Sequence, residues 1–192
     1  MWILMNLVLF ALGALGWTFT EYAMHNWVGH MGKGRNEFSR EHLAHHARQH
    51  YFTPTPKKLL TAFAVLTPMF LLFSWPFGWV GSGSFTVGFG LCYFAYEWLH
   101  RRLHTHPPQN WYGRWARKHH FYHHFGNPKF NHGVTTPIWD WVFRTYKTPE
   151  QIRVPEQLAM TWVFDHDTRV VHPQFSDDYF LAVKKSRRAV AA

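Results

Sequence analysis

Three long apolar runs, separated by short polar segments, dominate the pattern of hydrophobic and polar positions along the chain. Residues 2–23 form the first run, and as a helix this run measures about 33 Å, enough to cross a hydrocarbon core of about 30 Å. Residues 59–80 and 84–100 form two more runs, joined by a short turn rich in Gly and Ser. We therefore predict an all-α integral membrane protein with about three transmembrane helices, one N-terminal span followed by a hairpin.

The polar segments predict further helices. Residues from about 37 to 50 fit a polar helix, which Asn36 or Ser39 can cap. A second polar helix is expected at about 111–125. The tail from Thr136 onwards mixes Trp, Phe and charged residues, and we expect it to pack as short helices over the polar region.

Charge follows the same division. The chain has 20 Lys and Arg against 11 Asp and Glu, for a net charge of +9, and residues 1–20 and 59–96 contain none of them. A soluble fold would interleave charged and apolar positions. Because the basic residues flank the apolar runs and form no recognisable nucleic-acid motif, we assign them to positive-inside bias and expect no nucleic-acid partner. The single cysteine, Cys92, rules out a disulfide framework.

This charge bias also predicts the topology. Three passes place the N-terminus outside and all polar segments on the cytoplasmic face. The first run lacks a basic segment before it and continues directly into polar residues, so we expect a membrane anchor and not a cleaved signal peptide. The membrane would be the inner membrane of a bacterium, or the endoplasmic reticulum of a eukaryote.

Histidines recur at helical spacings at the ends of the apolar runs. Residues three and four apart share a helical face, so we expect each His-x2-His-His triplet to aim three imidazoles at one point. An α-helix would set His25 and His30 about 140° apart, so either they bind different ions or the helix unwinds between them. The ten candidate ligands are His25 and His30; His42, His45 and His46; His100 and His104; and His120, His123 and His124.

Ten imidazoles suffice for two metal ions, and with thiolates absent and carboxylates scarce they favour iron or zinc. The candidates for second-shell acceptors, which would fix the imidazole tautomers, are Glu21, Glu41, Glu97 and Asp140. Each of these is equally consistent with an ordinary ion pair. We expect no catalytic residue beyond the metal ligands. The histidines expected to be ordinary polar residues are His50, His106, His119, His132, His166 and His172.

The four histidine sets, followed by Gly133-Val134-Thr135-Thr136-Pro137-Ile138-Trp139-Asp140-Trp141-Val142-Phe143-Arg144-Thr145-Tyr146, resemble the fatty acid hydroxylase (sterol desaturase) superfamily of membrane di-metal oxygenases. The segment 133–146 resembles the fatty acid 2-hydroxylase branch. The resemblance covers about residues 15–150. With it, the expected organisation is a single domain over residues 1–192, with a cytosolic metal region at 25–58 and 100–150 and a C-terminal tail at 151–192.

The resemblance implies a nonheme site of two iron ions held by the ten histidines. Such a site uses O2 and two external electrons to hydroxylate an acyl chain, here at the carbon next to the carbonyl. The lipid would enter from the membrane. The 192 residues contain no His-Pro-Gly-Gly haem motif, so we expect a separate electron donor of cytochrome b5 or ferredoxin type with a reductase. Zinc could replace iron in purified protein, because it ranks above iron in typical site affinity.

Three alternatives remain open from the sequence. A carotenoid ring hydroxylase is also short and histidine-rich, but the segment 133–146 argues against it. A sterol or other lipid desaturase would share the same metal set. A histidine-rich metal transporter is the remote alternative, because transport would require ligands inside the spans, and here they lie at the ends of the spans or beyond.

Overall fold

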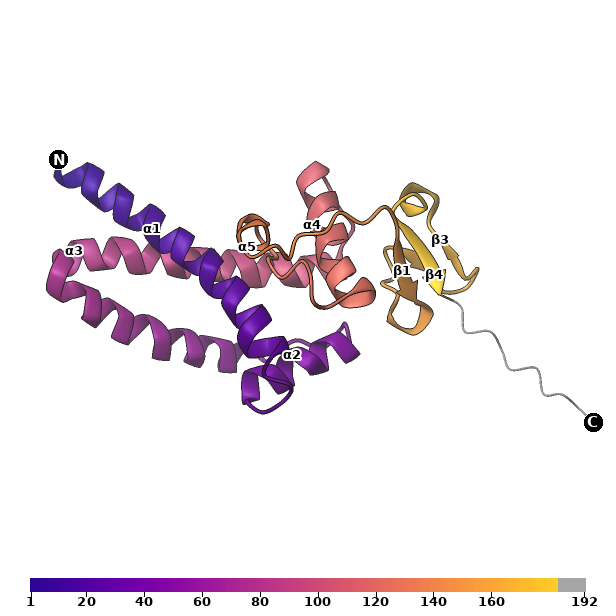
Figure 1. Cartoon of the computed structure of the whole chain (residues 1–192), viewed down its shortest axis with the longest axis horizontal. Coiled ribbons are helices and arrows are strands. Elements are labelled where there is room, and N and C mark those ends of the chain that lie inside the picture. Colours follow the sequence, from indigo (N-terminus) through magenta and orange to yellow (C-terminus); the bar gives the residue numbers. More distant parts are fainter. Residues whose placement is uncertain (183–192) are drawn as a thin grey trace, which may run out of the picture.

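The fold is mostly helical, and the computed structural model describes residues 1–182. Figure 1 shows α1 lying along the hairpin of α3, with the shorter elements gathered at one end of these long helices. The helices are α1 (Trp2–Ala23), α2 (Glu37–Ala47), α3 (Thr55–Thr105), α4 (Trp111–Phe121) and α5 (Ile138–Val142), with π-helical segments at Met24–His30 and Tyr122–Gly126.

The predicted hairpin lies within α3, but its turn is at Gly78 and not between residues 80 and 84, which are helical. Gly78 has φ +67° and ψ 171°, a backbone conformation that interrupts the helix and reverses its direction. The two arms, 55–77 and 79–105, then pack against each other, as the 4.6 Å separation of the Phe73 and Phe85 ring centroids shows. The returning arm is longer than the apolar run that predicted it, because its helix continues through polar residues to Thr105.

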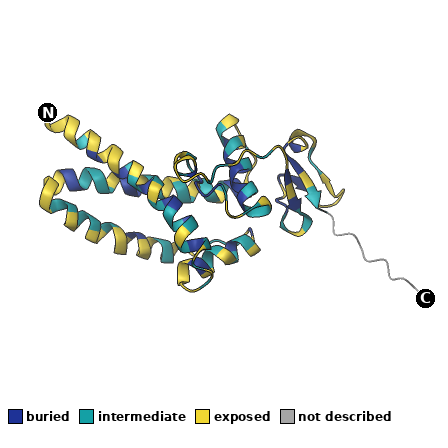
Figure 2. Ribbon diagram, in the orientation of Figure 1, coloured by how far each residue is buried: buried dark blue, intermediate teal, exposed yellow. Residues whose placement is uncertain are grey.

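Two helical stretches, Trp2–His30 and Thr55–Thr105, are long and apolar enough to cross a membrane, judged by length and composition. Only 17% of the apolar window in the first and 6% in the second is buried within the protein. Figure 2 shows the outward faces of α1 and α3 as largely exposed. A soluble core helix would be mostly buried, so this exposed apolar surface fits a lipid environment.

Glycines bring α1 into close contact with α3. A Cβ atom added at Gly13 would lie 2.0 Å from the carbonyl oxygen of Phe85, and one at Gly88 would lie 2.1 Å from that of Phe10. Only glycine permits this approach, which is typical of helix packing in membranes. The contact holds α1 against the returning arm of α3, and the histidine pairs at 25 and 30 and at 100 and 104 lie at the ends of these two helices.

The polar helices form where the sequence predicts them. Asn36 caps α2, since its side chain accepts a hydrogen bond from the backbone N–H of Ser39 at 2.7 Å. α2 ends at Ala47, three residues before the predicted end. α4 continues into its π-helical segment up to Gly126, so this helical region matches the prediction closely.

The tail corrects the all-α prediction. β1 (Ile152–Pro155) pairs in parallel with β4 (Tyr179–Ala182), and β2 (Phe164–Asp165) pairs antiparallel with β3 (Val170–Val171). Within β1, buried and exposed residues alternate, which is the two-residue period of a strand. Of the short helices predicted from Thr136 onwards, the described residues contain α5 and two 3-10 turns.

The tail nevertheless covers the polar region, as expected. Ile152 and Val154 share a buried core with Leu103 of α3 and Phe121 of α4. The indole N–H of Trp162 also donates to the backbone carbonyl of a histidine on α3. The last part of the predicted tail, residues 183–192, lies outside the described residues.

Candidate metal centre

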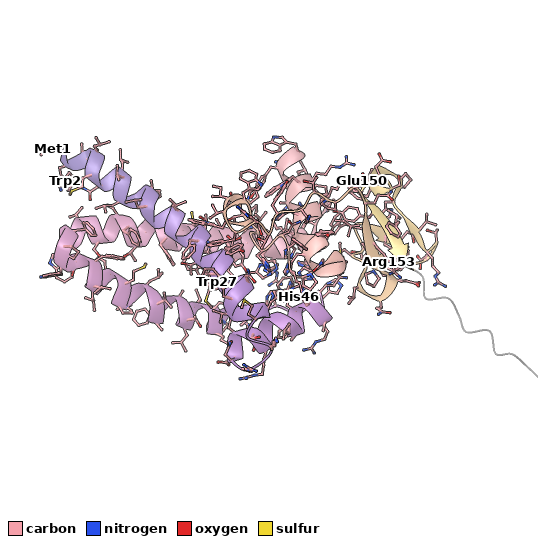
Figure 3. All side chains as sticks on the ribbon, in the orientation of Figure 1. Met1, Trp2, Trp27, His46, Glu150 and Arg153 are labelled. Carbon is pink, nitrogen blue, oxygen red and sulfur yellow. The ribbon has the colours of Figure 1, made fainter. Side chains whose placement is uncertain are left out.

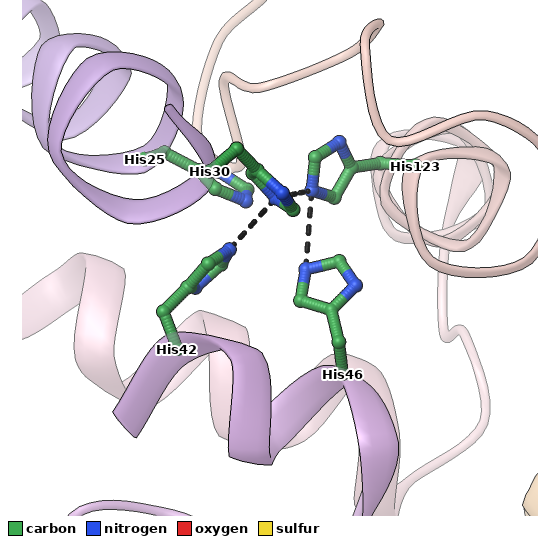
Figure 4. A group of neighbouring side chains, drawn as sticks. All are labelled: His25, His30, His42, His46 and His123. Atoms are coloured by element: carbon green, nitrogen blue, oxygen red, sulfur yellow. Dashed lines mark hydrogen bonds between the residues drawn. The ribbon is translucent and has the colours of Figure 1, made fainter. Parts of the chain in front are cut away.

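The ten predicted histidines come together at the end of the long helices, where Figure 3 shows their nitrogen atoms gathered around His46. They form two sets of five, and within each set one ligand nitrogen per residue lies within 4.8 Å of all the others. The first histidine group, drawn in Figure 4, is His25, His30, His42, His46 and His123, and the second histidine group is His45, His100, His104, His120 and His124.

Each triplet is divided between the two groups, which corrects the expectation that a triplet aims at one point. On α2, His42 and His46 are about 40° apart and belong to the first group, whereas His45 is about 100° from His46 and belongs to the second. The other triplet divides in the same way, with His123 in the first group. The rings of His46 and His124 stack at 4.0 Å where the groups meet.

A π-helix explains why His25 and His30 belong to the same group. The segment Met24–His30 has π-helical hydrogen bonding, in which residues five apart are neighbours along one face. The two rings stack with their centroids 5.5 Å apart. Of the two alternatives left open by the sequence, the structure has the local unwinding of the helix, with both residues in the first group.

Backbone carbonyls set the tautomer of three of the ten imidazoles. A ring nitrogen bonded to a carbonyl oxygen must carry the proton, which leaves the other nitrogen unprotonated and free to bind a metal. In all three residues Nδ1 is the donor, so Nε2 faces the group. The bonds run from His25 to the carbonyl of His132, from His45 to that of Tyr51 and from His123 to that of Phe130.

None of the four carboxylates predicted to fix the imidazole tautomers accepts a hydrogen bond from the ten histidines in the described part of the chain. Glu41 accepts a hydrogen bond from the hydroxyl of Tyr51, whose carbonyl holds His45. Asp140 accepts one from the backbone N–H of His132, at 2.8 Å. These two carboxylates therefore position the segments that position the imidazoles.

The other two carboxylates join elements of the fold. Glu21, only 3% exposed, accepts hydrogen bonds from the backbone N–H groups of Val134 and Thr135 and from the Thr135 hydroxyl. It thereby ties α1 to the loop before α5. Glu97 pairs with Lys58 across the two arms of α3, an ordinary ion pair of the kind that the sequence also allowed.

The electrostatics keep the imidazoles in the form that binds metal. Burial, followed by the neighbouring imidazoles, lowers the pKa of His42 and of His124 well below the usual value, and burial lowers the pKa of His45 to about 4. These side chains are therefore neutral at pH 7. Neutral imidazole is the ligand form, so the donor set fits divalent transition metals.

Unpaired nitrogens provide a second test of this fit. The Nε2 atoms of His25, His45 and His100 are buried without a hydrogen-bond partner among the described residues. A buried polar atom without a partner costs about 1–3 kcal/mol. Three such atoms pointing into groups of nitrogens are accounted for if metal ions complete the site.

Two of the histidines expected to be ordinary polar residues are buried beside the groups. His119 is 2% exposed, and its Nε2 lies 3.2 Å from a carboxylate oxygen of Asp140. His132 is 1% exposed, and its ring centroid lies 5.1 Å from that of His123. The sequence signals were that His119 adjoins a candidate ligand and that His132 lies close to Asp140 in the chain.

An apolar cavity of about 370 Å³ reaches the first histidine group from between α1 and the arms of α3. Trp17, Ala62 and Phe89 line its apolar part, and His25 and His42 line it where it meets the group. Lysine and glutamate side chains from α2 and α3 line its polar end, which includes Glu41, the residue before His42. The cavity is thus amphipathic, as a lipid is.

Comparisons with known proteins by family, by sequence and by structure give consistent matches. Residues 10–145 match the family model described as fatty acid hydroxylase. The chain is 34% identical to fatty acid 2-hydroxylase of Mus musculus over 149 residues, covering 71% of this chain and 39% of that protein. It is 32% identical to the ceramide very long chain fatty acid hydroxylase SCS7 of Saccharomyces cerevisiae over 153 residues, covering 74% and 38%.

A solved structure of full-length Scs7p, in which only the hydroxylase domain is visible, has the same fold. The TM-score is 0.63 at 26% identity, and the match covers 77% of this chain and 58% of that one. The chain spans less than half the length of the mouse and yeast relatives that it matches.

Proposed function

Because the chain belongs to the fatty acid hydroxylase family, we propose that it is a membrane-bound enzyme that hydroxylates a lipid acyl chain at the carbon next to the carbonyl. The observation that carries this proposal is that the cavity meets the first histidine group, where His25 and His42 line a space whose larger part is apolar. An acyl chain lying in this cavity would present a C–H bond to the metal site.

We propose all ten histidines as ligands of two iron ions, five to each group. Bound iron would supply the activation of O2, which protein side chains do not provide. The chain's own residues hold the imidazoles in their neutral tautomers and at fixed positions. Phe121 of α4 and Trp162 of the tail, buried in one core with Leu103 of α3, exclude water from the side of the second group.

The proposed membrane placement follows from charge and exposure. α1 and the two arms of α3 each cross the bilayer, which gives three passes and places the N-terminus outside. Both histidine groups then lie at the cytoplasmic face, in one domain comprising the whole chain. The exposed apolar faces of α1 and α3 and the charged residues at their inner ends support this orientation.

The polar end of the cavity favours a lipid whose head group is uncharged. Lys57 lies 2.7 Å from a carboxylate oxygen of Glu37 and 2.8 Å from one of Glu41, and Lys58 pairs with Glu97. The lysines at this end are therefore already neutralised, and they provide no free positive charge for a fatty acid carboxylate or for phosphates. An acyl chain in amide or ester linkage fits this end of the cavity better.

The test of this function is mass spectrometry of lipids from cells that express the protein with a cytochrome b5-type donor and its reductase. We expect amide- or ester-linked acyl chains heavier by one oxygen atom, with the hydroxyl at C2 by fragmentation. Cells that carry His124→Ala should lack them, since that residue belongs to the second histidine group.

Other products would contradict the proposal in defined ways. Acyl chains lighter by two hydrogens would identify a desaturase, and hydroxylated carotenoids would identify a ring hydroxylase. Unchanged lipids in cells whose protein carries two iron ions would show that the proposed substrate class is wrong.

The cavity provides a second prediction. Ala62 is 8% exposed and lines the apolar part, so Ala62→Phe should shorten the available space and shift the products towards shorter acyl chains. We expect long-chain hydroxylation to fall about tenfold or more, since a displacement of the C–H bond by about 1 Å can cost a hundredfold in rate. The chain-length distribution of hydroxylated products measures this effect.

The matched control is Leu60→Phe. Leu60 lies on the same helix but is 69% exposed and does not line the cavity. Its substitution should leave the distribution unchanged. Equal distributions for Ala62→Phe and the wild-type protein would exclude this cavity as the acyl-binding site.

A further inference from the structure

A partly exposed aromatic residue connects the protein surface with the second histidine group. Phe52 lies in the loop between α2 and α3, and its ring centroid is 5.2 Å from that of His45, 5.8 Å from His104 and 6.0 Å from His100. The preceding residue, Tyr51, accepts the hydrogen bond from His45 through its carbonyl. The loop therefore contacts the second group by both its backbone and its ring.

Two exposed arginines flank this aromatic residue. The guanidinium carbon of Arg101 lies 5.3 Å from the ring centroid of Phe52, and that of Arg48 lies 4.9 Å from the ring centroid of Tyr51. Neither arginine has a carboxylate within 4.0 Å among residues 1–182. We call Arg48, Tyr51, Phe52 and Arg101 the arginine–aromatic surface. It carries positive charge without a paired carboxylate on the loop whose Phe52 ring contacts the second group.

The two histidine groups thus differ in their surroundings. Residues of the first group line the lipid cavity, whereas none of the second group does so in the described structure. The second group is instead approached from the arginine–aromatic surface. This division separates the path of the lipid from a second path that starts at the polar surface.

The proposed reaction needs a path by which electrons reach the metal site. Insertion of one oxygen atom follows R–H + O2 + 2 e⁻ + 2 H⁺ → R–OH + H2O, in which the C–H bond breaks, a C–O bond forms, and the other oxygen is reduced to water. The side chains of this metal site are imidazoles, which supply no electrons. Both electrons must therefore come from a carrier that reaches the protein surface close to the metals.

We propose that an acidic electron-carrier protein docks on the arginine–aromatic surface and reduces the metal site through the second histidine group. The inference rests on the proposed function, because it requires redox-active metal in that group. Positive charge around an exposed aromatic centre would steer and orient an acidic partner, and such transient electron-transfer contacts are small, typically under about 1,200 Å². Phe52 marks the point of closest approach.

The experiment measures electron transfer in the absence of O2 and lipid substrate. The iron-loaded, oxidised protein in phosphatidylcholine nanodiscs is mixed with the reduced haem domain of cytochrome b5, and oxidation of the haem is followed by stopped-flow absorbance. We expect Arg48→Glu combined with Arg101→Glu to slow the second-order rate by at least about tenfold at low salt, because electrostatic steering contributes about 10- to 1,000-fold. The wild-type rate should fall steeply with added salt, and that of the variant should not.

A matched control comes from two lysines near the first histidine group. Lys147 lies 5.3 Å from the ring of Phe130, whose carbonyl holds His123 of the first group, and both Lys147 and Lys129 are exposed. Lys129→Glu combined with Lys147→Glu changes the net charge by the same amount. This variant should keep at least about half of the wild-type rate, and both variants should retain their metal and be reduced by dithionite as fast as the wild type.

Three outcomes would overturn the docking proposal. Equal rates for the arginine variant and the wild type would exclude this surface, and a larger loss in the lysine variant would place docking beside the first group. An arginine variant that is also slow with dithionite would show damage to the metal site and not to docking. If dithionite reduces no metal even in the wild-type protein, the proposed function itself fails, which separates the two hypotheses.

Discussion

A protein with both His46→Ala and His123→Ala will keep about one metal ion per chain, whereas one with both His123→Ala and His124→Ala will keep almost none. His46 and His123 belong to the first histidine group, so their joint loss leaves the second group complete. His123 and His124 belong to different groups, so their joint loss removes a ligand from each. Inductively coupled plasma mass spectrometry of the purified variants measures the metal content.

The reverse result would refute the division of the triplets. If each triplet held one metal ion, the neighbours His123 and His124 would share that ion, and their joint loss would leave the other site filled. Hydroxylation should fall by more than about a hundredfold in either double variant, beyond the range typical of second-shell partners. His50→Ala is the control, because His50 is exposed and lies outside both groups, and it should retain two metals and full activity.

Asp140→Ala is expected to destabilise the protein by about 3–5 kcal/mol, the range for breaking a buried charged network. The carboxylate is 0% exposed and bonds to the backbone N–H groups of His132 and Gly133, to the hydroxyl of Thr145 and to His119. Although burial raises the pKa of Asp140, the hydrogen bonds from His119, Thr145 and Gly133 bring its pKa below the usual value. Alanine would leave the two backbone N–H groups and His119 Nε2 without this partner, whereas the Thr145 hydroxyl would keep the Tyr22 hydroxyl.

The same substitution should weaken metal binding at the first group. Asp140 holds the backbone of His132, whose carbonyl accepts the Nδ1 proton of His25. Loss of such support typically costs 10- to 100-fold in metal affinity, so a competing chelator should remove about one metal per chain more easily. Thermal unfolding in detergent and chelator titration measure the two effects.

Asp177→Ala is the matched control, because Asp177 is an exposed aspartate of the tail. It should change the unfolding temperature by no more than about 2 °C, since exposed substitutions usually fall within about 0.5 kcal/mol. An Asp140→Ala protein as stable as this control would show that the network contributes little. Normal stability combined with normal metal retention would remove Asp140 from any role in positioning His25.

Helical periodicity and hydrophobicity act over a few residues, and the features that depend on them were predictable from the sequence alone. The apolar runs became α1 and the arms of α3, and Asn36 capped α2, whereas the turn formed at Gly78, inside the predicted run 59–80, and residues 81–83 are helical. The ten histidines were identified for the same reason, since their spacing within each helix is a local property. The family resemblance followed from these spacings and is shown by the comparisons.

The tertiary structure alone decided how the histidines combine. Adjacent residues on a helix differ by about 100° in direction, so the spacing of His45 and His46 is compatible with one shared metal site or with two. The choice depends on what lies on each side of α2. In the first group, the Nε2 atoms of His30 and His123, which are 93 positions apart in the chain, lie 2.8 Å from each other. In the second group, the Nε2 atoms of His104 and His120 lie 2.9 Å from each other. No pattern among neighbouring residues in the sequence predicts these contacts.

Tertiary contacts also decided the fold of the tail and the partners of the carboxylates. Ile152 and Tyr179 pair in a parallel sheet because both bury their side chains against α3 and α4, and short strands of four residues carry too little pattern to be told from other structure. Glu41 and Asp140 were found as candidates but bond to the segments that carry Tyr51 and His132. The sequence determined which groups are present and in what local geometry; long-range packing determined their partners, because contact between distant segments depends on the whole fold.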